Sequence, residues 1–266
     1  MQRRRFYATP DEIGESFINL SRDESHHLAR VLRLRDGDEA FAFDGYGREY
    51  RCRATRVDAQ AARLEIIEAL TGAVESPVDL TLAQALVKGE KFDTIVQKAT
   101  ELGVRRIAPL ITAHSDVRLN DERAEKRAER WRRIALEALK QSGGRRLVTI
   151  QAPAALADFI ASIATVAEPV VEPMQADAHQ SALPALLVFS ERGGLPINDA
   201  LGEVSYTQPI IACVGPEGGW SDDELGTLAS YGARFVTLGP RILRTETAAI
   251  VAVTLIQHRL GDLSRE

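Results

Sequence analysis

The stretch Ile210-Ile211-Ala212-Cys213-Val214-Gly215-Pro216-Glu217-Gly218-Gly219-Trp220-Ser221 carries the strongest structural signal in this sequence. Its five apolar residues predict a buried strand, and the glycine-rich run predicts a tight loop. Ser221 with Glu224 forms a capping box, so a helix is expected to begin there. Glycines between a strand and a helix leave backbone N–H groups open to a ligand. The pattern favours a ligand site beyond the strand, although a tight turn without a ligand fits it equally well.

A second loop of the same kind follows in the chain. Phe235–Leu238 predicts another strand, and Gly239-Pro240-Arg241-Ile242-Leu243-Arg244-Thr245-Glu246-Thr247 follows it directly. Two such loops could wall a single pocket. A helix is expected from about Ala248 to His258, and its side with Ala248, Ala249 and Ala252 permits the close backbone packing of a dimer seam or a knotted crossing. The charged residues of the loop need partners, which could be a structural ion pair.

The rest of the chain predicts two domains. Residues 1–73 contain short strands, including Glu49–Val57, where apolar residues alternate with arginines, as in a small barrel with one basic face. Residues 78–266 alternate strands with helices, which implies a parallel sheet covered on both faces. We expect residues 162–184 to form a variable surface loop.

Composition leaves several functions open and makes others improbable. The net charge is -5, but residues 118–146 carry ten basic and five acidic residues, so a nucleic-acid partner is not excluded. No apolar run approaches the ~18–20 residues that a membrane span needs. Cys52 and Cys213 match no metal-ligand spacing, so we expect no metal and a cytoplasmic location with free thiols.

The two glycine loops in combination resemble those of the ribosomal RNA uracil-N3 methyltransferases of the SPOUT superfamily. The resemblance extends over nearly the whole chain. Its further matches are Arg5-Phe6, His27-Leu28, Val31–Leu34, Gly37-Asp38, Phe43–Gly45, Lys88–Lys91, Gln97-Lys98, Glu101–Val104, Arg118, Trp131 and Gly261–Leu263. The segment Lys140–Arg145, Lys-Gln-Ser-Gly-Gly-Arg, departs from the family's usual Glu-Gln-Ser-Gly-Arg, and Val148 stands where a proline is usual.

The resemblance implies an α/β fold: a SPOUT-type trefoil-knot domain over residues 78–266 after a PUA-like, RNA-binding β-barrel over residues 1–73. It implies a homodimer that binds S-adenosylmethionine. The substrate would be a specific uridine of 16S ribosomal RNA near the decoding region, methylated at N3, either in free RNA or in the small ribosomal subunit.

The resemblance also implies roles for individual residues. The catalytic candidates are Arg241, Arg244 and Glu246. The cofactor is expected to contact Leu187, Gly215, Pro216, Glu217, Gly218, Gly219, Leu238, Gly239, Ile242, Leu243 and Thr247. RNA is expected to contact Arg3, Arg4, Arg5, Arg30, Arg33, Arg51, Arg53, Lys88, Lys91 and Arg118.

Three other functions stay open on the sequence alone. A SPOUT enzyme that methylates a ribose 2′-hydroxyl would share the knot, and a catalytically silent RNA-binding assembly factor would share the whole architecture. A nucleotide-binding metabolic enzyme could also use glycine loops. Neither loop, however, has the lysine-serine/threonine or G-x-G-x-x-G pattern that is typical of phosphate binding.

Overall fold

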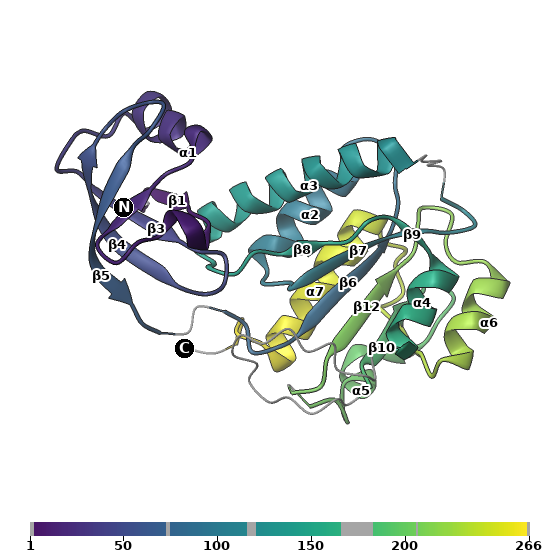
Figure 1. Cartoon of the computed structure of the whole chain (residues 1–266). Coiled ribbons are helices and arrows are strands. Elements are labelled where there is room, and N and C mark those ends of the chain that lie inside the picture. The colour runs from purple at the N-terminus through teal and green to yellow at the C-terminus, as the bar shows by residue number, and fades with distance from the viewer. Residues whose placement is uncertain (1–2, 73–74, 116–120, 166–182, 206, 265–266) are drawn as a thin grey trace. The chain divides into compact units, whose positions relative to one another are not determined.

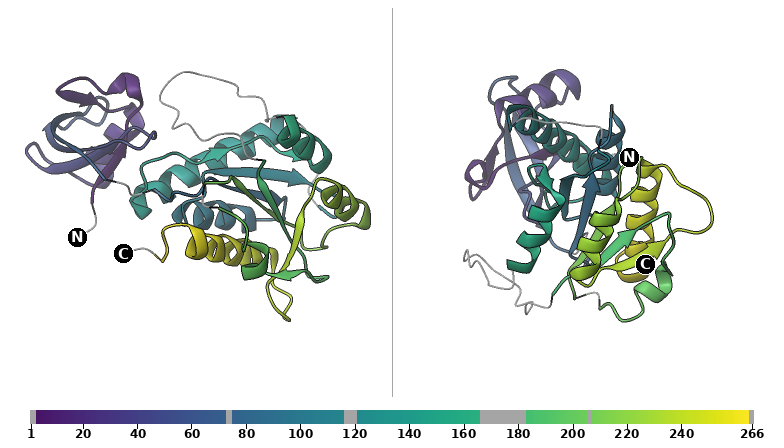
Figure 2. Two further views of the ribbon diagram at one scale, coloured as in Figure 1. Left: turned by 90° about the horizontal axis from the view of Figure 1, so that it is seen from below. Right: turned by 90° about the vertical axis from the view of Figure 1, so that its right-hand side faces the viewer.

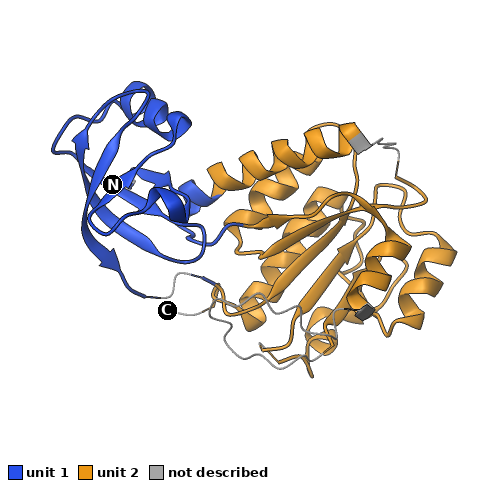
Figure 3. Ribbon diagram, viewed as in Figure 1, with its two compact units in different colours: residues 1–75, 139–147 blue, residues 76–138, 148–266 orange. Residues whose placement is uncertain are grey.

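The computed structural model describes residues 3–72, 75–115, 121–165, 183–205 and 207–264. The chain divides into two compact units, residues 1–75 with 139–147 and residues 76–138 with 148–266 (Figure 3). The sequence did not indicate that residues 139–147 join the first unit, because contacts between distant segments leave no local pattern. Within the described residues, no helix is long and apolar enough to cross a membrane.

The first unit is built on a five-stranded sheet. Its strands are β1 (Arg5–Tyr7), β2 (Phe17–Asn19), β3 (Glu39–Phe43), β4 (Glu49–Arg56) and β5 (Arg63–Leu70), in the order β1-β3-β4-β5-β2. The short elements η1 (Pro10–Glu12), α1 (Arg22–His26) and η2 (His27–Val31) connect them. In β4 the side chains of Cys52 and Ala54 enter the core, whereas Arg53 and Thr55 are exposed, so the predicted alternation is confirmed.

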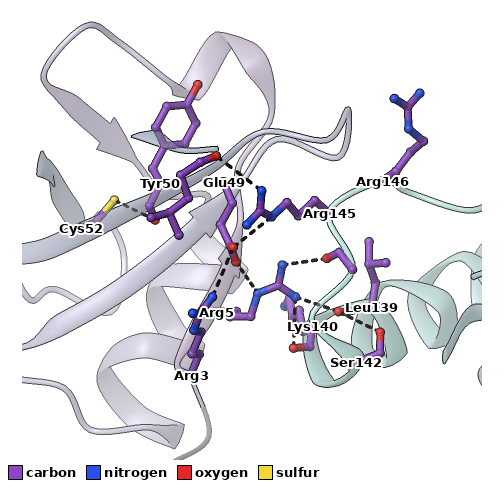
Figure 4. Close-up of polar contacts among 12 residues, drawn as sticks. Arg3, Arg5, Glu49, Tyr50, Cys52, Leu139, Lys140, Ser142, Arg145 and Arg146 are labelled. Carbon is purple, nitrogen blue, oxygen red and sulfur yellow. Dashed lines mark hydrogen bonds and ion pairs between the residues drawn. The ribbon is translucent and has the colours of Figure 1, made fainter. Parts of the chain in front are cut away.

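A buried ion cluster holds residues 139–147 to this sheet (Figure 4). The Glu49 carboxylate is 2% exposed and accepts hydrogen bonds from Arg5 Nε at 2.7 Å and Arg145 Nε at 3.1 Å. The guanidinium of Arg5 also donates to three carbonyl oxygens, those of Leu139, Lys140 and Gly144. Such charges are tolerated in a core only when they are paired and hydrogen-bonded on most sides, as they are here.

The second unit contains a parallel sheet in the order β11-β13-β10-β12-β6-β7-β8, with β9 beside β7. Its strands are β6 (Leu80–Ala85), β7 (Arg106–Ile111), β8 (Thr149–Ile150), β9 (Ala154–Ala155), β10 (Ala185–Phe189), β11 (Leu195–Pro196), β12 (Ile210–Val214) and β13 (Arg234–Thr237). Within the described residues, the strands of this sheet pair in parallel. The predicted parallel sheet is therefore confirmed, with β12 at the predicted bounds.

Helices cover both faces of the sheet (Figures 1 and 2). One face carries α2 (Lys91–Glu101), α3 (Asp121–Ser142), α5 (Ile197–Ala200) and α7 (Thr245–Leu260); the other carries α4 (Leu156–Thr165) and α6 (Asp222–Ser230). In β12, the side chains of Ile210, Ala212 and Val214 pack on the face covered by α2, α3, α5 and α7. Those of Ile211 and Cys213 pack on the face covered by α4 and α6. Both faces are thus apolar, which is why the strand reads as one hydrophobic run.

Several boundaries differ from the sequence prediction, and β13 lies one residue before the predicted Phe235–Leu238. Helix α7 begins at Thr245, three residues before Ala248, so that the end of the second glycine loop is helical. Residues 162–165, predicted as loop, complete α4. The remainder of that predicted loop lies mostly outside the described residues, and the trefoil knot stays a prediction.

The buried ion cluster makes a prediction about stability. Replacing Glu49 by glutamine leaves two buried guanidiniums without an anionic partner, so the free energy of unfolding should fall by about 3 kcal/mol or more. The control is Glu39→Gln, because Glu39 is 59% exposed and pairs with Arg51 at 3.7 Å. It should change stability by less than about 0.5 kcal/mol. Urea unfolding measures both variants, and equal small losses would contradict the role of the cluster.

Candidate functional site

A cavity of about 680 Å³ lies where three neighbouring strands of the second unit end. Strands β13, β10 and β12 are adjacent and parallel, so their carboxyl ends meet at the same sheet edge. Most of the cavity wall comes from the last residues of these strands and the residues that follow: 189–191 at β10, 214–219 at β12, and 237–239 with 241–244 at β13. This is the edge where the glycine loops predicted a ligand site.

The first glycine loop is held from three directions. Trp220 lies beneath Gly215, and its indole Nε1 donates to the Phe189 carbonyl oxygen at 3.1 Å. A Cβ on Gly218 would lie 2.9 Å from the Cβ of His114. Gly219 has φ +71°, and a Cβ there would lie 2.5 Å from a carboxylate oxygen of Glu191. The loop therefore needs glycine for its close approach to neighbours as well as for its backbone conformation.

The helix after this loop is anchored by its predicted capping box. Ser221 Oγ accepts from the Glu224 N–H at 3.3 Å, and Glu224 Oε2 accepts from the Ser221 N–H at 2.9 Å. The other oxygen of Glu224 accepts from the Ala113 N–H at 2.8 Å. Beside it, His114 Nδ1 lies 3.1 Å from the Gly219 carbonyl oxygen. The segment after β7 thus supports both the loop and the start of α6, which the sequence did not indicate.

Lys91, at the start of α2, lies in the cavity wall and pairs with Glu217 of the first glycine loop. The hydrogen bond to Glu217 and the negative charges of Glu217 and Glu246 raise the pKa of Lys91. Its ammonium group is therefore a cation at neutral pH. The sequence prediction assigned Lys91 to RNA, and the structure places it beside the predicted cofactor loops.

The three catalytic candidates occupy different positions. Arg241 and Arg244 are exposed and line the cavity. Glu246, in the first turn of α7, does not line it, and its Oε2 atom is buried without a hydrogen-bond partner among the described residues. The arginines are thus exposed at the cavity, and no ion pair of either is seen among the described residues.

Most of the predicted cofactor residues gather around the cavity. Those in its wall are Gly215, Pro216, Glu217, Gly218, Gly219, Leu238, Gly239, Ile242 and Leu243. Leu187 and Thr247 are absent from it, because Leu187 is wholly buried in the middle of β10 and Thr247 is exposed on α7. Sequence reasoning missed Phe189, Ser190, Glu191, Val214, Thr237, Thr245 and Ala248. The polar pair Ser190-Glu191 after a buried strand was the signal that could have revealed that part of the wall.

The predicted RNA-binding residues are in several environments. The prediction that Arg5 contacts RNA is wrong, because Arg5 is 5% exposed and its guanidinium donates to Glu49 and to backbone carbonyls. Arg3, Arg4 and Arg51 reach solvent but form ion pairs with Glu49, Asp38 and Glu68. Arg30, Arg33, Arg53 and Lys88 are exposed, and Arg118 lies outside the described residues. In the departing segment Lys140–Arg145, Lys140 and Arg145 are buried in ion pairs with Glu24 and Glu49, and the exposed cation nearby is Arg146, the next residue.

Known proteins match both units. The protein-family model of the RNA methyltransferase domain matches residues 74–257. The family model of the RNA methyltransferase PUA domain matches residues 20–67. The ribosomal RNA small subunit methyltransferase E of Synechocystis is 32% identical over 96% of this chain and 78% of its own length. Its counterpart in Bacillus subtilis is 30% identical over 97% of both chains.

Solved structures agree with this assignment. A Legionella pneumophila putative methyltransferase with bound S-adenosylmethionine has a TM-score of 0.83 at 31% identity, covering 99% of this chain and 100% of that one. The Neisseria gonorrhoeae ribosomal RNA small subunit methyltransferase E, also bound to S-adenosylmethionine, has a TM-score of 0.81 at 30% identity, covering 98% and 99%. The expected PUA-like unit and SPOUT-type α/β domain are thereby confirmed. Because relatives of this identity extend over nearly its whole length, the chain belongs to the ribosomal RNA small subunit methyltransferase E family.

Proposed function

We propose that this chain transfers the methyl group of S-adenosylmethionine to N3 of one uridine in small-subunit ribosomal RNA, in the bacterial cytoplasm. The observation that carries the proposal is the cavity at the ends of β10, β12 and β13, walled by both glycine loops, in a chain of this family. Two solved relatives, each at least 30% identical, hold S-adenosylmethionine.

The residues of the cavity suit this cofactor. Backbone of the two glycine loops forms much of the wall, and Phe189, Leu238 and Leu243 add apolar surface for an adenine ring. The acidic residues Glu191 and Glu217 line the same cavity, where Glu217 pairs with Lys91. They complement a ligand that carries both a sulfonium and an ammonium group. The cavity volume also falls within the range of about 300–1,000 Å³ that is usual for ligands of this size.

The bound cofactor would supply an electrophilic methyl group, and the protein's part is to align the uracil and to manage its N3 proton. Removing that proton places negative charge on the uracil ring. Arg241, Arg244 and Lys91 are cations at the cavity and would stabilise this charge or grip the neighbouring phosphates. Lys91 acts as a cation and not as a base, because Glu217 raises its pKa. The Glu246 carboxylate either accepts the proton or positions the arginines.

The product of the reaction tests this proposal. Purified protein, S-adenosylmethionine and either free 16S ribosomal RNA or assembled small subunits should yield N3-methyluridine at one position. Ribosomal RNA from cells without the protein should lack that methyl group. A 2′-O-methylated nucleoside would favour the ribose reaction, and cofactor binding without any methyl transfer would favour a silent assembly factor.

We also propose that the exposed arginines of the first unit bind RNA phosphates. Arg30, Arg33 and Arg53 are exposed, so replacing each by glutamine should weaken RNA binding and lower the slope of log K against log salt by about one unit. The matched control is Arg234→Gln, because Arg234 belongs to the second unit and pairs with Glu203 at 3.5 Å. If the variant with all three replacements kept the salt slope of the unmodified protein, the RNA contacts would have to come from residues 118–146 instead.

We further propose a homodimer that pairs through α7. The residues first expected at the seam, Ala249 and Ala252, are 1% and 0% exposed because they pack inside their own subunit. The half-buried side of α7 includes Val251 and Leu255, four residues apart on one face. Leu255→Asp should therefore give folded monomers with little activity, whereas Ala252→Asp should unfold the protein. Light scattering at micromolar concentration decides this, and a monomeric unmodified protein would contradict the proposal.

A further inference from the structure

Gln84 is a wholly buried amide near the end of β6, whose other side chains are apolar except for Thr81. Its register partners are Val214 in β12 and Pro109 in β7, so it lies beside the strand that leads into the first glycine loop. A primary amide is unfavourable in such a place unless hydrogen bonds compensate for its lost hydration. The hydrogen bonds of Gln84 therefore indicate its role.

The amide nitrogen of Gln84 makes these bonds. Nε2 donates to the Ala85 carbonyl oxygen at 2.9 Å and to Thr245 Oγ1 at 3.1 Å, and the Val214 carbonyl oxygen lies further away, at 3.5 Å. The Ala85 carbonyl can only accept, which fixes the amide with its nitrogen on this side. Since Thr245 accepts from Gln84, the single proton of its hydroxyl is free to donate elsewhere. It donates to the Gly215 carbonyl oxygen at 2.7 Å.

This chain of hydrogen bonds joins the two glycine loops. Thr245 is the first residue of α7, where the second loop becomes helical, and Gly215 begins the first loop. Both residues line the cavity. On its other side, Gly215 packs against the Trp220 ring, where an added Cβ would lie only 3.1 Å away. Gly215 is thus held between the Thr245 hydroxyl and the indole.

We propose that Gln84 is a positioning residue for the cofactor, although it does not line the cavity. By donating to Thr245 it fixes the direction of that hydroxyl, and through it the Gly215 backbone and the spacing of the two loops. The inference rests on the proposed function, since it concerns S-adenosylmethionine at this cavity. The other amide atom, Oε1, is buried without a partner among the described residues, so the donor side of Gln84 is the side in use.

Substitutions that keep side-chain volume test the relay. Gln84→Met and Thr245→Val each remove a donor and should raise the Kd for S-adenosylmethionine about tenfold, as expected for one lost hydrogen bond. Thr245→Ser keeps the hydroxyl and should bind within about twofold of the unmodified chain. The double variant Gln84→Met/Thr245→Val should bind no more weakly than Thr245→Val, because Gln84 acts through that hydroxyl. Calorimetric titration gives each Kd.

Gln257→Met is the matched control. Gln257 is also wholly buried, but it lies at the other end of α7, where it donates to the Leu102 and Gly103 carbonyls. This variant should lower the melting temperature without changing the Kd.

Three results would overturn the inference alone: an unchanged Kd in Gln84→Met, additive losses in the double variant, or equal weakening by Thr245→Ser and Thr245→Val. If Gln84→Met does not fold, the two Thr245 variants still decide. Failure of the unmodified chain to bind S-adenosylmethionine would overturn the proposed function and this inference together.

Discussion

The parallel pairing of β12 with β10 and β6 is the constraint on which the candidate site depends. Backbone hydrogen bonds fix the register of these strands, and side chains on both faces are buried. None of the strands can slide without moving apolar residues out of their cores. Their carboxyl ends therefore stay together, and flexible glycine-rich segments become a defined wall. The rigid sheet supplies the position, and the loops supply the chemistry.

In the first unit, two segments of the chain are joined by buried ion pairs instead of by strand pairing. Glu49 lies between two guanidiniums that come from strand β1 and from the segment after α3. Ion pairs of this kind depend strongly on geometry, because each partner alone would be costly in the core. They connect segments that share no apolar pattern, and they tie an N-terminal strand to the middle of the chain.

Local patterns in the sequence were enough to predict the parallel sheet and most of the residues in the cavity wall. Strand β12 is apolar on both faces and the residues after it are glycine-rich, so its bounds and its loop followed directly. Leu187 and Ala252 show where such reasoning ends. Both are apolar residues near the site, and the sequence cannot say that their side chains turn toward the core. Arg5 was equally ambiguous, since the partner that buries it lies 44 residues away.

The first unit is made of two separate segments of the chain, and this has a consequence for its synthesis on the ribosome. Its last strand, β5, ends at Leu70 and its first part at Glu75, but the segment that supplies Arg145 to Glu49 ends at Leu147. The 72 residues from Ser76 to Leu147 must be translated in between. At about 5–20 residues per second this takes roughly 4–14 seconds. During that interval the nascent sheet holds a carboxylate that lacks one of its two buried partners, so the first unit cannot reach its final state before more than half of the chain exists.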